Sequence, residues 1–284
     1  MSGIFFDARY IRPTFHDGIS RFSANLFAAV SKLTDVTAII SDEAQLDSLP
    51  AGTKWVKLNA ATSALEPFAA LRLNRHKPSV VFSPMQTIGS FGRNFKLILT
   101  IHDLIYYRHP KPPANLPPLV RFGWRLFHLT YVPERILLAG CESVVAVSEA
   151  TAKDIRSNRL TKKPITVVYN APEPSHQSSG RSKPTKTLVY MGTFMSYKNV
   201  ETLIRGVALL DGYRLELLSR ISAERKASLE KLAFEVGADV RFHNGVSDSE
   251  YSNMLNTATA LVSASLDEGF GIPVVEALAH GVPV

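Results

Sequence analysis

The last twenty residues, Ser265 to Val284, combine a glycine-rich loop with two carboxylates. Glu268 precedes the residues Gly-Phe-Gly, and Glu276 follows eight positions later, beyond Pro273. The apolar run before the loop predicts a buried strand, and the proline predicts the start of a helix. Backbone amides in a loop that joins a strand to a helix can bind phosphate oxygens. The pattern therefore predicts a site for a nucleoside diphosphate at the carboxyl edge of a parallel sheet.

The same loop has a second, purely structural explanation. Gly269 and Gly271 would let the backbone approach a ligand closely, and the amides of Gly269 to Ile272 are the expected phosphate donors. We expect Glu276 in the first turn of the helix, where the helix dipole stabilises a carboxylate without any ligand. The residues by themselves leave both explanations of Glu276 open.

Another loop, Met191 to Asn199, follows a second apolar run and carries Lys198 near its end. A lysine at the carboxyl edge of a sheet can bind a diphosphate. The alternative is a solvated surface lysine. The dipole of the following helix disfavours a cation there, which favours a binding role.

His102 and Asp103 follow a third apolar run, at the expected carboxyl end of a strand. A lone histidine is either catalytic or structural, and both roles stay open here. The other histidines show no metal-ligand spacing and no Asp-x-Asp element occurs, so we expect no metal and no cofactor. The single Cys141 excludes a disulfide framework and a cysteine-rich zinc site.

Composition indicates a globular protein of one large or two ordinary domains, with 284 residues of which 45% are hydrophobic and 20% charged. Residues 1–170 contain 21 lysines and arginines against 12 acidic residues, so this half is strongly basic. This positive charge could serve to bind an anionic membrane surface, or it could be a solvated surface without a partner. No nucleic-acid recognition motif is present. Neither a basic leader nor an uncharged run of about 18 apolar residues occurs. We therefore expect a cytoplasmic location, and leave open a peripheral position on the inner face of the membrane.

Strand-like and helix-like segments alternate along the chain, which is typical of an α/β fold with a parallel sheet covered by helices. In the first half we expect strands at Ile4–Asp7, Val36–Ile40, Val80–Phe82, Leu97–Ile101, Ser143–Val147 and Ile165–Val168, with helices at Gly18–Ser31, within Leu119–Leu138, and at Thr151–Asn158 after an N-cap at Ser148. In the second half we expect strands at Leu188–Gly192, Leu215–Leu218, Val240–Phe242 and Ala258–Ala264, with helices at Val200–Leu210, Ala223–Val236 and Asp248–Thr257.

The segment 173–186 is rich in proline, serine and charge and lacks apolar periodicity, which predicts an interdomain linker. We expect a Rossmann-like domain at residues 1–172 and another at 187–284. Val282 to Val284 reads as the beginning of a further strand. The second domain would thus have only about four strands before the sequence ends.

Several of these segments together resemble the retaining glycosyltransferase family 4 (glycosyl transferases group 1). The resemblance covers nearly the whole chain and implies the GT-B fold, in which two Rossmann-like domains face each other across a cleft. The segments that carry it are Asp17–Phe22, Ile101–Leu104, Val145–Ala150, Val168–Asn170, Gly192–Asn199 and the two glutamates of Glu268–Glu276.

The resemblance implies a role for each candidate residue. Glu268 would lie near the transferred sugar and Glu276 would bind the ribose. His102 would face the reacting centre from the first domain. Lys198 would bind the donor diphosphate, and Gly192 would belong to the same donor-binding loop. Phe270 and Gly271 would present backbone amides to the sugar and the phosphate. Gly18 would lie near the phosphates or the acceptor. Many relatives also carry an arginine in the diphosphate loop, whereas here Thr193 follows the glycine and Tyr197 precedes the lysine. Charge neutralisation would therefore depend more on Lys198 and the helix start.

The resemblance also bears on the end of the sequence, because relatives continue past Gly-Val-Pro-Val with further strand–helix units. We therefore expect a truncated chain whose second domain is incomplete, with an unpaired strand and reduced stability.

The resulting hypothesis is a hexosyltransferase, with mannose from GDP-mannose as the expected transfer and a UDP-sugar as the alternative donor. The acceptor would be a saccharide or a lipid-linked saccharide in the synthesis of a cell-surface polysaccharide. A non-catalytic module that binds nucleotide sugar is the first alternative. A nucleotide-dependent epimerase of similar shape is the second.

Overall fold

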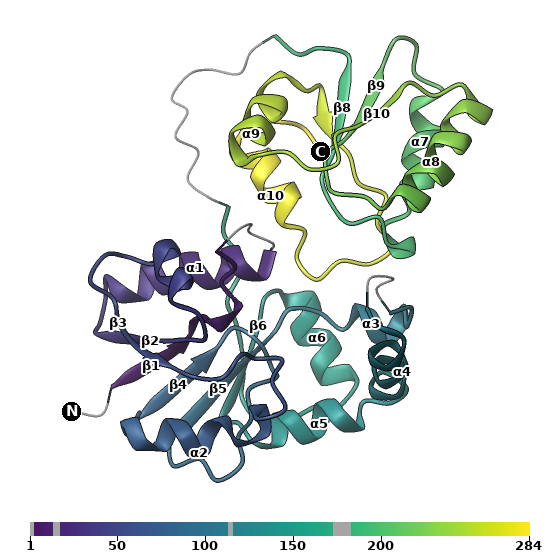
Figure 1. Cartoon of the computed structure of the whole chain (residues 1–284). Coiled ribbons are helices and arrows are strands. Elements are labelled where there is room, and N and C mark those ends of the chain that lie inside the picture. Colours follow the sequence, from purple (N-terminus) through teal and green to yellow (C-terminus); the bar gives the residue numbers. More distant parts are fainter. Residues whose placement is uncertain (1–2, 14–17, 113–115, 173–182) are drawn as a thin grey trace. The chain divides into compact units, whose positions relative to one another are not determined.

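The computed structural model describes residues 3–13, 18–112, 116–172 and 183–284. Its chain divides into two compact units, residues 1–170 and 171–284. Each unit is built on its own parallel sheet with helices packed against it (Figure 1). Most of the expected linker, residues 173–182, lies outside the described residues.

The sheet of the first unit has seven strands, all parallel, in the order β3-β2-β1-β4-β5-β6-β7. Strand β1 pairs with β2 on one side and β4 on the other, so that Ile4 lies opposite both Val36 and Val80. The carboxyl ends of all seven strands therefore share one edge. The strands are β1 (Ile4–Asp7), β2 (Val36–Ile40), β3 (Lys54–Lys57), β4 (Val80–Ser83), β5 (Lys96–Ile101), β6 (Ser143–Ala146) and β7 (Ile165–Val167).

Alternate side chains along these strands enter two different cores, because successive residues of a strand point to opposite faces. Leu97, Leu99 and Ile101 pack in one core with helices of one face. Phe6 packs in the other core, where its ring meets the ring of Phe27 from α1 edge to face at 5.5 Å. The helices of this unit are α1 (Gly18–Ser31), α2 (Ala69–Leu73), α3 (Ile105–Arg108), α4 (Pro118–Phe127), α5 (Val132–Ala139) and α6 (Glu149–Ser157).

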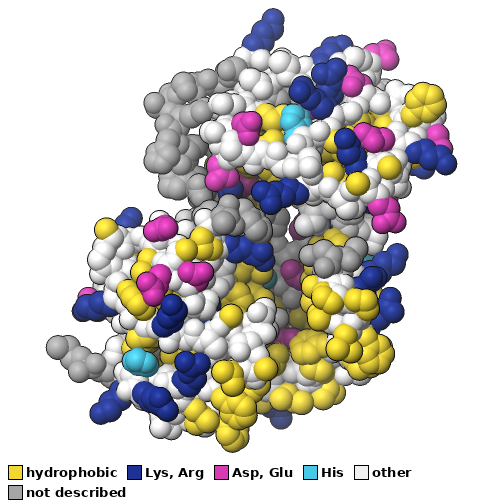
Figure 2. Space-filling view, in the orientation of Figure 1, with side chains coloured by type: hydrophobic (Ala, Val, Ile, Leu, Met, Phe, Trp, Pro, Cys, Tyr) yellow, Lys and Arg dark blue, Asp and Glu magenta, His cyan; other side chains and the backbone are white. Residues whose placement is uncertain are grey.

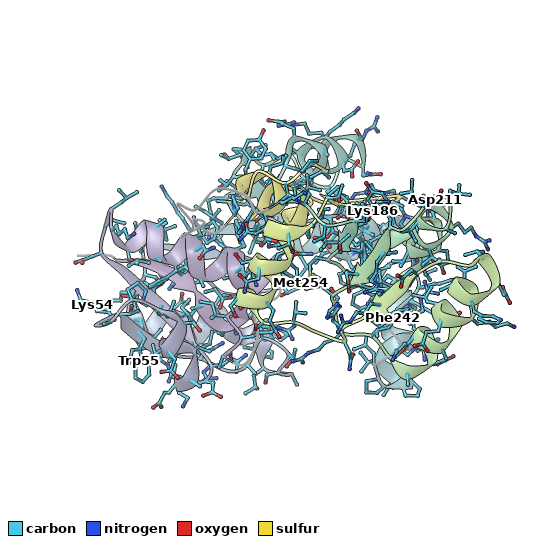
Figure 3. All side chains as sticks on the ribbon, turned by 90° about the horizontal axis from the view of Figure 1, so that it is seen from above. Lys54, Trp55, Lys186, Asp211, Phe242 and Met254 are labelled. Atoms are coloured by element: carbon cyan, nitrogen blue, oxygen red, sulfur yellow. The ribbon has the colours of Figure 1, made fainter. Side chains whose placement is uncertain are left out.

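The sheet of the second unit has four parallel strands in the order β10-β9-β8-β11. Helices cover both of its faces, with α7 and α8 packed in one core and α9 and α10 in the other. At its amino-terminal edge the Lys186 ammonium donates to the Asp211 carbonyl at 2.9 Å (Figure 3). The elements are β8 (Thr187–Tyr190), β9 (Arg214–Leu217), β10 (Val240–Phe242), β11 (Ala260–Leu261), α7 (Val200–Val207), α8 (Ala223–Val236), α9 (Asp248–Thr257) and α10 (Ile272–Ala279).

Two sequence predictions are corrected by the structure. The long helix expected within Leu119–Leu138 is wrong, because α4 ends at Phe127 and α5 begins separately at Val132. Pro133 occupies the first turn of α5, where its missing N–H costs nothing, whereas inside one continuous helix it would break the ladder. The strand expected at Ala258–Ala264 shrinks to the two residues of β11.

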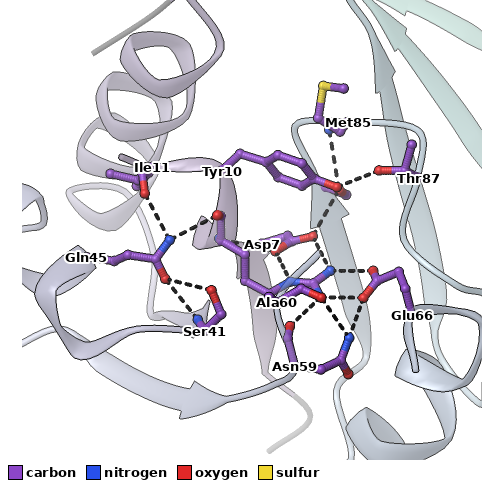
Figure 4. Close-up of polar contacts among 12 residues, drawn as sticks. Asp7, Tyr10, Ile11, Ser41, Gln45, Asn59, Ala60, Glu66, Met85 and Thr87 are labelled. Carbon is purple, nitrogen blue, oxygen red and sulfur yellow. Dashed lines mark hydrogen bonds and ion pairs between the residues drawn. The ribbon is translucent and has the colours of Figure 1, made fainter. Parts of the chain in front are cut away.

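A buried ion network ties the start of the chain to a segment far along it (Figure 4). The Arg9 guanidinium, whose side chain is wholly buried, donates to Asp7 Oδ1 at 2.7 Å and to Glu66 Oε2 at 2.7 Å. Asn59 Nδ2 donates to the same Glu66 oxygen at 2.6 Å. Burial alone would lower the pKa of Arg9, but Asp7 and Glu66 more than offset it and raise the pKa above its usual value. The network therefore holds a charged arginine beside the carboxyl end of β1.

Candidate functional site

Two loops meet at the carboxyl edge of the second sheet. The first follows β8 and ends in a short 3-10 turn, Ser196–Lys198, and the second follows β11. The Lys198 ammonium lies 2.6 Å from Glu268 Oε1. The Leu266 amide donates to the Tyr197 carbonyl at 2.8 Å. The structure therefore brings together Lys198 and Glu268, which are 70 residues apart in the sequence.

The Lys198 side chain is largely buried and makes two contacts with its ammonium. Only 15% of its side chain is exposed, compared with 38% for Glu268. The ammonium also lies 5.3 Å from the centroid of the Tyr197 ring, which favours a cation over its face. A positioned cation at the edge of a parallel sheet can bind the phosphates of a nucleotide.

Glu276 lies in the second turn of α10, so its expected place in the first turn is wrong. The helix begins at Ile272 after Gly271, whose φ of +83° lies in the left-handed region. Pro273 is then the second helical residue and Glu276 the fifth. The favourable effect of a helix dipole fades beyond the first turn, which weakens the purely structural explanation of this carboxylate. Glu276 is nevertheless buried, with 9% of its surface exposed.

Gly192 has its amide already engaged, because its N–H donates to Ser219 Oγ at 3.0 Å. A Cβ at this position would lie 2.7 Å from the Tyr190 hydroxyl oxygen, so any larger residue would force this hydroxyl to shift. The Tyr190 hydroxyl in turn donates to the Thr193 carbonyl at 2.6 Å. Burial, with the negative charge of Glu268 next, raises the pKa of Tyr190, so the hydroxyl remains a donor. These contacts give Gly192 a structural role in shaping the loop.

The first unit places its own candidate residues at the carboxyl edge of its sheet. His102 follows β5, and its Nε2 lies 2.8 Å from the Pro84 carbonyl oxygen. Because a carbonyl can only accept, Nε2 carries the proton. The imidazole meets the ring of Phe22 from α1 edge to face at 5.1 Å. Gly18, the first residue of α1, lies one turn before Phe22, whereas residues 14–17 of the expected glycine loop are outside the described residues.

Arg225 supports the site and was missed by the sequence interpretation. Its Nε donates to the Phe194 carbonyl in the loop after β8 at 3.2 Å, and its Nη2 lies 2.7 Å from Glu201 in the first turn of α7. Arg225 lies in the first turn of α8, so no local spacing in the sequence connects it with that loop. The only signal was the Ser222 N-cap, which fixes where α8 begins.

The structure also bears on a metal site and on a membrane span. Among the described residues, no group of three or more His, Cys, Asp or Glu side chains could hold a metal ion. Within the same ranges, no helix combines the length and apolar character needed to cross a bilayer.

Two family models match the chain, one for each unit. The model of Glycosyltransferase Family 4 matches residues 17–175. The model of Glycosyl transferases group 1 matches residues 172–284. Together they span both candidate groups of residues.

Individual relatives have low sequence identity to this chain, but the matches extend over most of its length. The chain is 26% identical to the O-antigen chain mannosyltransferase RfbU of Salmonella typhimurium over 94% of its own length and 77% of that protein. It is 30% identical to the MMP alpha-(1->4)-mannosyltransferase of Mycolicibacterium hassiacum over 67% of its length, but this covers only 47% of the relative. The solved structure of sucrose-phosphate synthase from Thermosynechococcus elongatus is similar to this fold, with a TM-score of 0.72 and 17% sequence identity. The match covers 100% of this chain and 80% of the synthase chain. This last similarity concerns the fold alone.

Proposed function

Because the chain belongs to glycosyltransferase family 4, we propose that it transfers mannose from GDP-mannose to a saccharide or lipid-linked saccharide, with retention of configuration at the sugar. Transfer of a sugar is the activity of the family. The identity of the sugar and of the acceptor is the proposal. Two mannosyltransferases among the relatives support mannose, and the O-antigen function of RfbU supports an acceptor used in a cell-surface polysaccharide.

The ion pair between Lys198 and Glu268 is the observation that carries this proposal. In the transfer, the bond between the sugar and the diphosphate breaks and negative charge develops on the leaving phosphate. A fixed cation stabilises that charge without reorganisation. We propose that Lys198 provides this cation, aided by the backbone of Phe270 and Gly271 at the start of α10.

The two carboxylates would divide the remaining contacts to the donor. Glu268 would contact the transferred sugar and Glu276 the ribose hydroxyls, with neither forming a covalent bond to the sugar. His102 would contribute from the first unit, near the acceptor, and Gly18 would lie near the phosphates or the acceptor. Gly192 would act through the shape of the loop, because its amide is engaged by Ser219.

Calorimetry with GDP-mannose and with UDP-glucose tests the proposal. We expect saturable binding of GDP-mannose that weakens at least about tenfold in Lys198→Ala, because a charge-assisted contact to phosphate is lost. Lys231→Ala is the matched control, since this lysine is exposed on α8. Binding of UDP-glucose alone would replace the proposed donor.

Turnover of the donor separates transfer from the alternatives. Release of GDP that depends on a saccharide acceptor is the expected result. Binding without any turnover would indicate a non-catalytic nucleotide-sugar module, and epimerised donor without acceptor would indicate an epimerase. A folded chain that binds no nucleotide sugar would refute the proposal.

A further inference from the structure

Helix α4 presents different apolar side chains on two opposite faces. On the inner face, the ring centroid of Trp124 lies 4.8 Å from that of Tyr106, and the centroid of His128 lies 5.0 Å from that of Tyr107. Trp124 and His128 are one turn apart, so both reach the same side of the helix. This aromatic packing attaches α4 to the first unit.

The outer face carries a stripe of exposed apolar residues. Leu119, Phe122 and Leu126 are spaced three and four residues apart, as on one side of a helix, and 81%, 60% and 53% of their surfaces are exposed. No residue of α4 is buried. Figure 2 shows hydrophobic side chains gathered over α4, with lysine or arginine side chains beside them. The exposed set continues beyond the helix with Leu129, Val132 and Ile136.

Positive charge accompanies this stripe. Arg121 and Arg125 lie one turn apart on α4, and with Pro118 and Phe122 they line a shallow hollow in the surface. From Leu104 to Pro133 the sequence contains four lysines and arginines and no acidic residue. An anionic group would thus meet cations and apolar carbon side by side at this face.

An exposed apolar group of this extent marks an interaction surface more often than it marks plain solvent contact. A helix with an apolar stripe, a basic flank and no acidic residue matches the charge of an anionic lipid surface. We infer that the outer face of α4 docks on an anionic phospholipid bilayer. The stripe enters the boundary of the acyl chains, and Arg121 and Arg125 contact lipid phosphates. This docking rests on the proposed function only where the acceptor is a lipid-linked saccharide, which it would bring within reach.

Sedimentation of the full chain with vesicles tests the inference, with phosphatidylglycerol–phosphatidylcholine vesicles compared with phosphatidylcholine alone. We expect Arg121→Gln with Arg125→Gln to weaken binding to the anionic vesicles about thirtyfold. Phe122→Gln with Leu126→Gln should weaken it at least about a hundredfold. The matched controls are Lys32→Gln with Arg205→Gln, and Leu209→Gln with Phe234→Gln, all exposed in the structure. Both controls should change binding by less than about twofold.

Three results would overturn the inference: no preference of the wild-type chain for anionic vesicles, an equal loss in the control variants, or a dimer that the α4 variants dissociate while vesicles never bind. Binding of GDP-mannose by the same variants is expected to stay unchanged. Failure of docking with intact donor binding would therefore refute the membrane surface and leave the proposed function standing. Vesicle binding by a wild-type chain that does not bind the donor would refute the proposed function and leave the membrane surface standing.

Discussion

Lys198 and Glu268 form a partly buried ion pair, in which 15% of the lysine side chain and 38% of the glutamate side chain are exposed. Its importance lies in position, because the pair holds an ammonium at the sheet edge and keeps the local charge balanced. Under the proposed function, a diphosphate at this edge would compete with the Glu268 carboxylate for the same cation. We therefore expect the two residues to affect binding of the donor in opposite directions.

Glu268→Gln tests this opposition. We expect tighter binding of GDP, by about threefold to tenfold, because a negative charge next to the diphosphate is removed. Sugar transfer should fall in the same variant, since the proposed contact to the sugar is weakened. Calorimetry with GDP and initial rates of transfer measure the two effects. Weaker GDP binding, as expected for Lys198→Ala, would contradict the competition.

Glu134, at the start of α5, is a buried carboxyl with an unusual charge state. Its Oε2 accepts from the Tyr107 hydroxyl at 3.3 Å, and its Oε1 has no hydrogen-bond partner among the described residues. Burial raises its pKa from 4.5 to about 7, against the lowering effect of hydrogen bonds from Tyr107 and Gln86. As pH rises, Glu134 therefore ionises in the unfolded chain before it ionises in the folded protein. The contribution of this carboxyl to the free energy of unfolding is fully present below pH 4.5 and is lost as pH rises through about 7.

Glu134→Gln should remove this pH dependence. Between pH 4.5 and a value just above 7, we expect the free energy of unfolding of the wild-type chain to fall by about 3 kcal/mol relative to the variant. Denaturant titrations of both chains across this range measure the difference, and their values at the acid end serve as the reference. Parallel curves would show that Glu134 ionises normally.

At the scale of elements, the start of α10 depends on one backbone conformation. Gly271 precedes the helix with a φ of +83°, which side chains with a Cβ rarely adopt. This conformation turns the chain from the loop that carries Glu268 into α10. The loop and the helix amides that we assign to the diphosphate are thus oriented by a single glycine.

Two glycine substitutions separate this effect from ordinary helix propensity. Gly271→Ala should destabilise the protein by about 1–2 kcal/mol and weaken donor binding, because the left-handed conformation is strained. Gly206→Ala is the matched control, since Gly206 lies inside α7 with open space around its Cβ position. It should stabilise the protein by up to about 1 kcal/mol and leave donor binding unchanged. Thermal unfolding and calorimetry check both variants.

Elements with strong local signals were predicted well from the sequence. Helix α8 has its predicted bounds, and its Ser222 side chain accepts from the Arg225 amide as an N-cap does. Helix α6 likewise follows the predicted cap at Ser148. Strand β3 was missed because Lys54–Lys57 is a largely exposed edge segment that contains no apolar run.

The candidate site was only partly predictable for a related reason. The loops were recognisable because glycine, lysine and glutamate are conspicuous at strand ends. Their pairing was not, because the 2.6 Å contact of Lys198 with Glu268 depends on the order β8-β11 in the sheet. The same holds for Arg225, which reaches the loop after β8 from another helix.

At the scale of the whole molecule, each unit carries its own cores. Every buried member of the first two hydrophobic clusters lies within residues 1–170, and every member of the other two lies within 171–284. A cavity in one core removes contacts only from its own sheet and helices. We therefore expect the local stability of the two units to respond separately to core substitutions.

Leu217→Ala tests this separation. Leu217 is fully buried in β9, so we expect a loss of about 2–5 kcal/mol within the second unit. Hydrogen exchange followed by mass spectrometry should show faster exchange in peptides from residues 183–284 and no change in peptides from 18–112. Leu99→Ala in β5 should give the converse pattern. Equal acceleration in both units would show that they unfold together.

The buried network of Asp7, Arg9 and Glu66 also constrains how this sequence can change. Loss of one partner leaves an uncompensated charge in the interior, which typically costs about 3–5 kcal/mol, whereas apolar replacement of all the partners together can be neutral. A change from one stable combination of these three residues to another therefore passes through destabilised single substitutions. In a library that randomises the three codons, functional clones should retain all three residues or replace all three together. We thus expect the three positions to vary jointly and not one at a time.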